Sequence, residues 1–247
     1  MNIIEYRRRR EGLVSIRHLP LFLLMNFEHH NFIGMYENAL DDYACDYLIK
    51  YFEDNIDRAN PGVVVSGEKD LVHKNVKDSL DLLCQVDRES DWVVNNIIFQ
   101  SLAMGMLEYK DTYNIVQAMP AWEPVPDYNI QRYLPGQGFK KYHYEHGLHN
   151  PYIILAWMFY LNDVPDGGTD FPYINMQLNA KKGNLAIWPA GFTHLHAGIV
   201  SETTTKYIVT GWIHYENTFY AERRFNDPTK NTDEINEPAW TQKVPPW

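Results

Sequence analysis

Two histidines and one glutamate stand at spacings that can hold a metal ion. His143 and Glu145 are two positions apart, and His196 follows much later in the chain. Strand side chains alternate, so a pair two positions apart points to one face. A histidine from a distant strand can complete a set of two imidazoles and one carboxylate, which suits Fe(II) and leaves coordination positions open. We predict that these three residues form a metal site.

Three other histidines compete for the same role. His146 and His149 lie close to Glu145, and His194 lies two positions before His196. His146 is adjacent to Glu145, so on a regular strand the two side chains face opposite ways. His194 has the same parity as His196 and stays open as an alternative. The residues that follow His196 favour His196 over His194 as the second histidine ligand.

A lysine follows His196 at the start of a predicted strand. Lys206 shares one strand face with Ile208, Thr210 and Trp212. The apolar and aromatic members indicate that this face is buried. A buried ammonium without a partner costs on the order of several kcal/mol, so Lys206 needs an anion. The partner is either a protein carboxylate or the carboxylate of an acidic cosubstrate, and the residues alone allow both.

The elements that must position these residues are short strands in the second half of the chain. Apolar or alternating runs, bounded by turn residues, predict strands over Tyr128–Leu134, Phe139–Glu145, Ile153–Leu161, Leu185–Trp188, Gly198–Val200 and Tyr207–His214. Strands at this spacing favour a sandwich or barrel. The two glycines between Asp166 and Pro172 predict a turn.

Two helices are predicted in the first half. One runs from Asn38 to about Glu53, and the other follows a cap at Ser90 and Asp91 and ends near Tyr109. Because the helices precede the strands, we expect them to cover one outer face of a sheet. The sequence therefore predicts an α+β fold with a mainly β core.

The composition is that of a globular protein. The chain has 247 residues and a formal net charge of −10, so nucleic acid would be repelled and we expect no nucleic-acid partner. Aromatic residues make up 14%, which favours a β-rich core. The two cysteines, Cys45 and Cys84, lie in apolar patterns, and we predict buried thiols in a reducing cytoplasm.

The N-terminal residues resemble a secretory signal peptide in part. A basic run at 7–10 precedes an apolar run at 19–25, but His18 and Pro20 interrupt the stretch and no small-residue cleavage site follows. The apolar run is also too short to span a bilayer, so we expect no membrane partner.

We predict one main domain. It covers residues 31–220, as a helical prelude (31–127) and a β core (128–220), between an N-terminal extension over 1–30 and an irregular tail over 221–247. The oligomeric state stays open.

Several motifs together resemble one enzyme family. They are Tyr133-Leu134-Pro135-Gly136-Gln137, His143-x-Glu145, Tyr160-Leu161-Asn162, Gly167-Gly168-Thr169-x-Phe171, Lys182-Gly183-Asn184-Leu185-Ala186-Ile187-Trp188, and the spacing of His196, Lys206 and Trp212. In these motifs the chain resembles the prolyl 4-hydroxylase-type branch of the Fe(II)/2-oxoglutarate-dependent oxygenases, over roughly 128–215 and a helical prelude from about Phe32. It is also similar to oxygenases of marine phages and bacteria, which implies a cytoplasmic protein, of a cell or of a virus acting in its host.

The resemblance implies a fold, cofactors and roles. The fold would be a double-stranded β-helix (a cupin-like jelly roll), and the cofactors Fe(II), 2-oxoglutarate and O2, with ascorbate to restore Fe(II). The residues would be the iron ligands His143, Glu145 and His196, and the cosubstrate residues Lys206, Tyr133, Thr169 and Trp212. Lys206 would pair with the distal carboxylate, Tyr133 and Thr169 would hydrogen-bond it, and Trp212 would line the pocket. The substrate would be a prolyl residue of a peptide or protein, with a small molecule as the other option.

The chain departs from the family pattern at the metal carboxylate. Glu145 stands where the family has aspartate, and Lys140 replaces a family tyrosine, with Phe139 one place earlier. A β-sandwich module that binds a metal or a glycan without catalysis is therefore the competing hypothesis.

Overall fold

The computed structural model describes residues 26–66, 69–147 and 150–215. Most of the expected N-terminal extension, with its basic and apolar runs, and the whole expected tail over 221–247 lie outside these residues. Within them, no helix is both long enough and apolar enough to cross a membrane.

Eight strands of the second half form a jelly roll. Successive strands change sides between two antiparallel layers, except that β12 and β13 pair with each other on the same side. The larger sheet contains β9 (Tyr128–Tyr133), β11 (Ile153–Tyr160), β14 (Leu185–Pro189) and β16 (Lys206–Tyr215). The smaller side contains β10 (Gly138–Phe139), β12 (Val164–Phe171), β13 (Met176–Ala180) and β15 (Ala197–Ile199). This arrangement confirms the predicted double-stranded β-helix.

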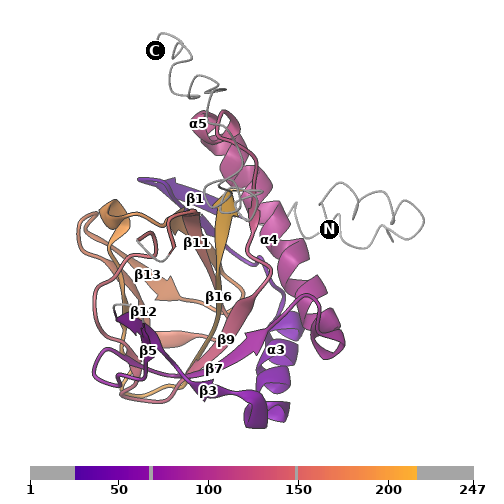
Figure 1. Cartoon of the computed structure of the whole chain (residues 1–247), viewed down its shortest axis with the longest axis vertical. Coiled ribbons are helices and arrows are strands. Elements are labelled where there is room, and N and C mark those ends of the chain that lie inside the picture. Colours follow the sequence, from indigo (N-terminus) through magenta and orange to yellow (C-terminus); the bar gives the residue numbers. More distant parts are fainter. Residues whose placement is uncertain (1–25, 67–68, 148–149, 216–247) are drawn as a thin grey trace, which may run out of the picture.

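The first half of the chain extends the larger sheet at both ends (Figure 1). At one end β1 (Phe27–His30) pairs with β2 (Ile33–Tyr36), which pairs with β14; at the other, β7 (Leu80–Cys84) lies between β9 and β3 (Asn60–Pro61). The remaining short strands are β4 (Val64–Ser66), β5 (Lys69–Leu71), β6 (Lys77–Asp78), which pairs with β10, and β8 (Trp122–Pro124), which pairs with β16. Residues 27–30 of the expected N-terminal extension are thus part of the sheet.

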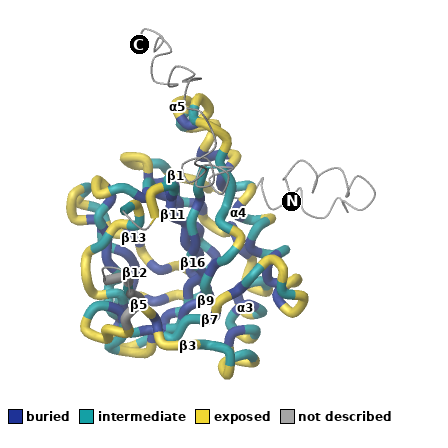
Figure 2. The backbone as a smooth tube through the Cα atoms, viewed as in Figure 1, coloured by how far each residue is buried: buried dark blue, intermediate teal, exposed yellow. Residues whose placement is uncertain are grey.

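The helices cover the outer face of this sheet, as predicted. They are α3 (Asp42–Asp54), α4 (Trp92–Thr112) and the short α5 (Asn114–Gln117), with single turns η2 (Ile56–Arg58), η3 (Glu89–Asp91) and η4 (Phe192–His194). Figure 1 shows α3 and α4 along one side of the β core. On β11, Trp157 and Phe159 pack in the cluster under the helices, whereas Ala156 and Met158 pack in a second cluster between the sheets. Strand alternation therefore gives the sheet two apolar faces, and β11 and β16 are largely buried (Figure 2).

The start of the first helix and the capping of the second differ from the predictions. The first helix begins at Asp42, not near Asn38, and the Asp41 carboxylate caps it by accepting from the Ala44 N–H at 2.7 Å. The second helix begins directly after Asp91, as predicted, but the Asp91 side chain forms no capping hydrogen bond. Asp91 is fully buried and accepts instead from Arg58 Nη2 at 2.9 Å and from the Gln85 N–H at 2.9 Å.

Two predictions about strands are also wrong. The strand predicted over Phe139–Glu145 ends at Phe139, and beyond it His143 forms only an isolated bridge with His196. The turn predicted between Asp166 and Pro172 lies inside β12, at a register shift between Val164 and Gly168. Gly168 has a φ of 138°, and a Cβ there would lie 2.0 Å from the Leu178 carbonyl oxygen. The glycine therefore permits a β-bulge, not a reversal.

Both cysteines are buried free thiols, as predicted. Cys45 packs from α3 and Cys84 from β7, each with no exposed surface. Burial raises the pKa of both thiols to about 12, so they stay protonated at neutral pH.

Candidate metal and cosubstrate site

Backbone hydrogen bonds place the two predicted histidine ligands side by side. The His143 N–H donates to the His196 carbonyl at 2.9 Å, and the His196 N–H donates to the His143 carbonyl at 2.9 Å. The Glu145 N–H donates to the Ala190 carbonyl at 3.0 Å, which fixes the segment two residues later. The segment is not a regular strand, yet its His143 and Glu145 side chains still reach the same point.

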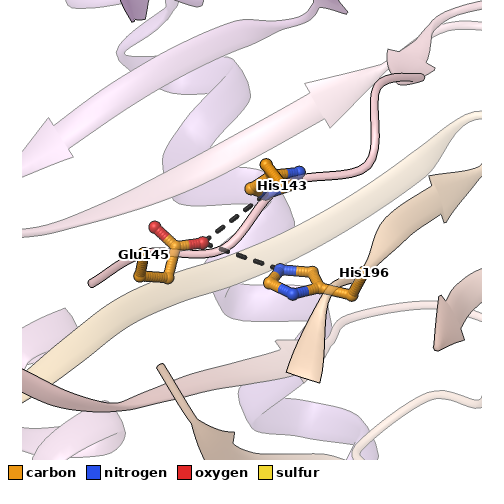
Figure 3. Close-up of side chains that lie close together, drawn as sticks. All are labelled: His143, Glu145 and His196. Atoms are coloured by element: carbon orange, nitrogen blue, oxygen red, sulfur yellow. Dashed lines mark ion pairs between the residues drawn. The ribbon is translucent and has the colours of Figure 1, made fainter. Parts of the chain in front are cut away.

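The three side chains converge on one small volume. Glu145 Oε1 lies 3.5 Å from His143 Nε2 and 3.6 Å from His196 Nε2. One ligand atom from each residue lies within 4.8 Å of the others, and Figure 3 shows the three side chains turned towards one another. Ligand atoms about 2.1 Å from a common ion fit these separations. The donor set therefore fits one ion held by two imidazoles and a carboxylate.

Each histidine is held in the tautomer that a metal ligand needs. His143 Nδ1 lies 2.9 Å from the Lys141 carbonyl, and His196 Nδ1 lies 3.0 Å from the His194 carbonyl. A carbonyl oxygen only accepts, so in both rings Nδ1 carries the proton and Nε2 keeps its lone pair. Both Nε2 atoms face Glu145 and are free to bind a cation.

The Glu145 carboxylate divides its two oxygens between the histidines and a tryptophan. Oε1 faces both imidazoles, while Oε2 accepts from Trp212 Nε1 at 2.9 Å. Burial by itself would raise the pKa of Glu145, but the contacts with His143 and His196 outweigh it and lower that pKa far below its usual range. The carboxylate is thus ionised and oriented before any ligand arrives. Trp212, expected to line the pocket, contacts the carboxylate directly.

Aromatic rings enclose the two histidines. Phe139 stacks on His143 with 3.6 Å between ring centroids, and Trp188 and Phe171 pack against His196 at 5.1 and 5.5 Å. His196 is buried and His143 partly buried, with side-chain exposures of 7% and 21%. The site lies at the edge of the jelly-roll interior and is partly open to solvent.

Lys206 is buried at the start of β16, with 4% of its surface exposed. Its ammonium donates to the Ile199 carbonyl at 3.0 Å and lies 5.3 Å from the centre of the Tyr133 ring. In the part of the chain that the structure describes, no Asp or Glu forms an ion pair with it. Burial lowers the pKa of Lys206 to about 8. Its ammonium therefore has neutral partners only, which favours the anionic cosubstrate over a protein carboxylate.

The other predicted cosubstrate residues lie inside the same barrel. Thr169 is buried on β12 and shares a hydrogen bond of 2.7 Å with the Tyr160 hydroxyl. Tyr133 is buried on β9, opposite Lys206 in the β9–β16 ladder, and its hydroxyl donates to Gln131 Oε1 at 2.7 Å. The sequence motifs assigned no role to Tyr160 or Gln131. Tyr160 is hydrogen-bonded to Thr169, and Gln131 lies two positions before Tyr133 and accepts its hydrogen bond.

The two rival histidines that the structure describes, His194 and His146, lie within hydrogen-bond distance of backbone carbonyls. His194 Nε2 lies 2.7 Å from the Asn31 carbonyl, and His146 Nδ1 lies 3.0 Å from the Ile153 carbonyl. His149 lies outside the described residues. Neither described rival belongs to the cluster of possible metal ligands.

Comparisons with known proteins agree with this geometry. Residues 128–214 match the family model of the 2OG-Fe(II) oxygenase superfamily. A comparison with curated protein sequences gives no significant match.

Solved structures share the fold at low sequence identity. A viral collagen prolyl hydroxylase from Paramecium bursaria Chlorella virus 1, in a 2OG complex, is 20% identical, with a TM-score of 0.53 over 75% of this chain and 96% of its own. A Pseudomonas putida prolyl-4-hydroxylase is 13% identical, with a TM-score of 0.53 over 74% and 92%. A Trichoplax adhaerens prolyl hydroxylase, bound to a peptide fragment of hypoxia inducible factor, is 9% identical, with a TM-score of 0.60 over 80% and 88%. Residues 128–214 are therefore similar to the 2OG-Fe(II) oxygenase superfamily, and the described part of the chain shares its fold with prolyl hydroxylases of known structure.

Proposed function

We propose that this protein hydroxylates a C–H bond of a prolyl residue in a peptide or protein, using Fe(II), O2 and 2-oxoglutarate and releasing succinate and CO2. The observation that carries the proposal is the convergence of two imidazole Nε2 atoms and one carboxylate oxygen in the same jelly roll as the ammonium of Lys206, which has no carboxylate partner among the described residues.

The proposed iron ligands are His143, Glu145 and His196. A ferrous ion bound there would supply the activation of O2 that is coupled to oxidative decarboxylation of 2-oxoglutarate. The chain's own part is to present an open face of the metal, because three protein ligands leave positions for cosubstrate and O2. The aromatic rings on both histidines limit the access of water to that face.

The proposed anchor of the distal cosubstrate carboxylate is Lys206, with Thr169 as a hydrogen-bond donor. An ion pair formed by a buried ammonium is strong, because little water screens it. The Tyr160 hydroxyl, which bonds Thr169, would orient the threonine hydroxyl. Ascorbate would serve as the reductant that returns the iron to Fe(II).

A peptidyl proline is supported by the fold relatives and by the surface near the ligands. Tyr144, between two proposed ligands in sequence, is 49% exposed, and Phe192, in η4, is 70% exposed. Exposed aromatic rings are the usual contact surface for extended, proline-containing peptides. The structures of similar fold named above are prolyl hydroxylases, one of them bound to a peptide.

The test begins without oxygen. Fe(II) and 2-oxoglutarate are added anaerobically, the weak visible charge-transfer band is recorded, and O2 is then admitted with a proline-rich peptide while succinate and hydroxyproline are measured. We expect a band, and succinate formation that the peptide stimulates. Metal binding without band or succinate would favour the non-catalytic module and overturn the proposal.

A matched pair of variants tests the ligand assignment. His196→Ala should abolish the band, whereas His194→Ala, two positions earlier and outside the cluster, should keep it. The opposite result would show that the second histidine is wrongly assigned.

A further inference from the structure

A half-buried carboxylate outside the oxygenase motifs organises the polar groups behind Tyr133. Asp81, on β7, accepts from three side chains: Ser79 Oγ at 2.7 Å, Lys77 Nζ at 2.6 Å and Gln131 Nε2 at 3.0 Å. The Asp81 and Lys77 side chains are only 13% and 9% exposed. A buried charge with this many partners is held in one orientation.

The direction of each hydrogen bond in this network follows from the carboxylate. An ionised carboxylate only accepts, so the amide of Gln131 must turn its nitrogen towards Asp81. Its oxygen then faces Tyr133, 2.7 Å away, and the phenol must donate to it. Burial and the charge of Asp81 raise the pKa of Tyr133 well above its usual value, so the phenol keeps this proton.

The sheet register places these groups in one row. Asp81 pairs with Gln131 across β7 and β9, and Tyr133 pairs with Lys206 across β9 and β16. Directly paired strand residues place their side chains on the same face. The row therefore ends at the ammonium of Lys206, which lies 5.3 Å from the Tyr133 ring centre.

A second branch leads to the metal ligands. Lys77 Nζ lies 5.7 Å from the centre of the Phe139 ring, and Phe139 stacks on His143. Asp81 is thus linked through Gln131 to Tyr133 beside the anchor lysine, and through Lys77 to Phe139 beside one proposed ligand.

We propose that Asp81 is a positioning residue for the cosubstrate site. Asp81 orients the Gln131 amide so that its oxygen accepts the hydrogen bond from the Tyr133 hydroxyl. Tyr133 therefore donates no hydrogen bond to 2-oxoglutarate and supports Lys206 with its ring. This inference rests on the proposed function. It departs from the donor role that the family resemblance implies for Tyr133.

A double-mutant cycle on the full chain tests it. The dissociation constants of Fe(II), and of 2-oxoglutarate in the presence of Fe(II), are measured anaerobically for Asp81→Asn, Tyr133→Phe and the double variant. Asparagine can present either end of its amide, so the direction of the network is no longer fixed. We expect each single variant to weaken 2-oxoglutarate binding about threefold to fivefold, and the double variant by no more than either single one. Fe(II) affinity should stay within about twofold, because the three ligands are untouched.

Several outcomes would overturn the inference. If Tyr133→Phe alone weakens 2-oxoglutarate binding more than about tenfold, the hydroxyl donates to the cosubstrate directly. If the double variant shows the product of the single effects, Asp81 does not act through Tyr133. An equal loss of Fe(II) and 2-oxoglutarate affinity would indicate a general structural role.

Two further variants keep the test decisive. Asp78→Asn, on the neighbouring β6, is the matched control and should leave both affinities unchanged. Should Asp81→Asn fail to fold, Gln131→Met removes the amide that links Asp81 to Tyr133 and should reproduce the same selective loss. If the wild-type protein gives no band, the proposed function fails; if it gives a band and the cycle is multiplicative, only this inference fails.

Discussion

At the scale of single residues, Glu145 replaces the shorter aspartate of the family with a side chain that has contacts for both oxygens. Its Oε2 accepts from the Trp212 indole, which leaves Oε1 turned to the two imidazoles. The additional methylene is thus accommodated by a fixed orientation of the carboxylate. A hydrogen bond that orients a metal ligand commonly contributes tenfold or more to metal affinity.

The first prediction removes this hydrogen bond. Trp212→Phe keeps most of the ring but loses the indole N–H, so Oε2 is left unpaired and Glu145 can rotate. We expect Fe(II) affinity to fall about tenfold, with the protein still folded. An anaerobic Fe(II) titration measures it, and an unchanged affinity would show that the indole does not orient the ligand.

The second prediction separates stability from binding at Lys206. Lys206→Met removes a buried ammonium that pairs with no carboxylate in residues 26–66, 69–147 and 150–215, and the thioether side chain has a similar shape. We expect the metal-free protein to be stabilised by about 2 kcal/mol at pH 7, because a buried charge is replaced by an apolar group. The affinity for 2-oxoglutarate should fall at least about a hundredfold. Urea unfolding and the anaerobic band measure the two quantities; a variant that loses both stability and affinity would contradict this account of Lys206.

The third prediction concerns pH. The pKa of Lys206 is about 8 in the folded protein, below the usual 10.5 that the unfolded chain retains. Between these values the unfolded chain binds more protons, so the free energy of unfolding rises with pH from about 8 to 10.5, by about 3 kcal/mol in total. Below pH 8 both states are protonated and the contribution is constant. Urea unfolding at pH 8, 9 and 10 without ligands should show this rise, and Lys206→Met should lack it.

The same titration acts on binding with the opposite sign. The cosubstrate needs the charged lysine, so the affinity for 2-oxoglutarate should fall about tenfold per pH unit above pH 8. A flat profile in the wild-type protein would show that Lys206 is not the anchor.

At the scale of elements, β12 holds Thr169 in place through a bulge. Gly168 has a φ of 138° and leaves no room for a Cβ beside the Leu178 carbonyl. Gly168→Ala should destabilise the protein by at least about 2 kcal/mol, because the new methyl group forces β12 and β13 apart. Gly191→Ala is the control, since no atom lies within 4 Å of its added Cβ. Thermal unfolding compares the two; equal stability would contradict the close approach of the strands.

The elements also show what the sequence can predict. Apolar or alternating runs identified β9, β11, β14 and β16, because these strands are packed between two apolar layers and carry many apolar residues. The segment after Phe139 does not alternate in the structure, because single backbone bonds to His196 and Ala190 hold it in place of a ladder. Its ligands were found from chemical type and spacing. The Asp81 network was missed, because hydrogen bonds between side chains on neighbouring strands leave no periodic signal.

At the scale of the whole molecule, the helical prelude and the jelly roll share one sheet and one core. Strands β2 and β7 flank the jelly-roll strands, and the helices cover the apolar outer face of β11 and β14. The region that matches the family model, 128–214, therefore has an uncovered apolar face when it is isolated.

A prediction about folding follows from this shared core. A fragment of residues 26–215 should unfold in one cooperative transition, whereas a fragment of 128–215 should aggregate or lack fixed tertiary packing, because its sheet loses one of its two covers. Calorimetry and near-ultraviolet circular dichroism of both fragments test this. Cooperative unfolding of 128–215 would show that the prelude is dispensable for folding.

The isolated bridge between His143 and His196 has a consequence for the way occupancy can be detected. Two amide hydrogens cross between these residues, each at 2.9 Å from its acceptor, and no strand ladder extends the pair beyond them. Such a short pair opens easily in solution, so both amides should exchange with deuterium quickly while the site is vacant. An ion bound by both imidazoles would hold the two segments together and slow the exchange of these amide hydrogens. Their protection would therefore report metal binding without any turnover.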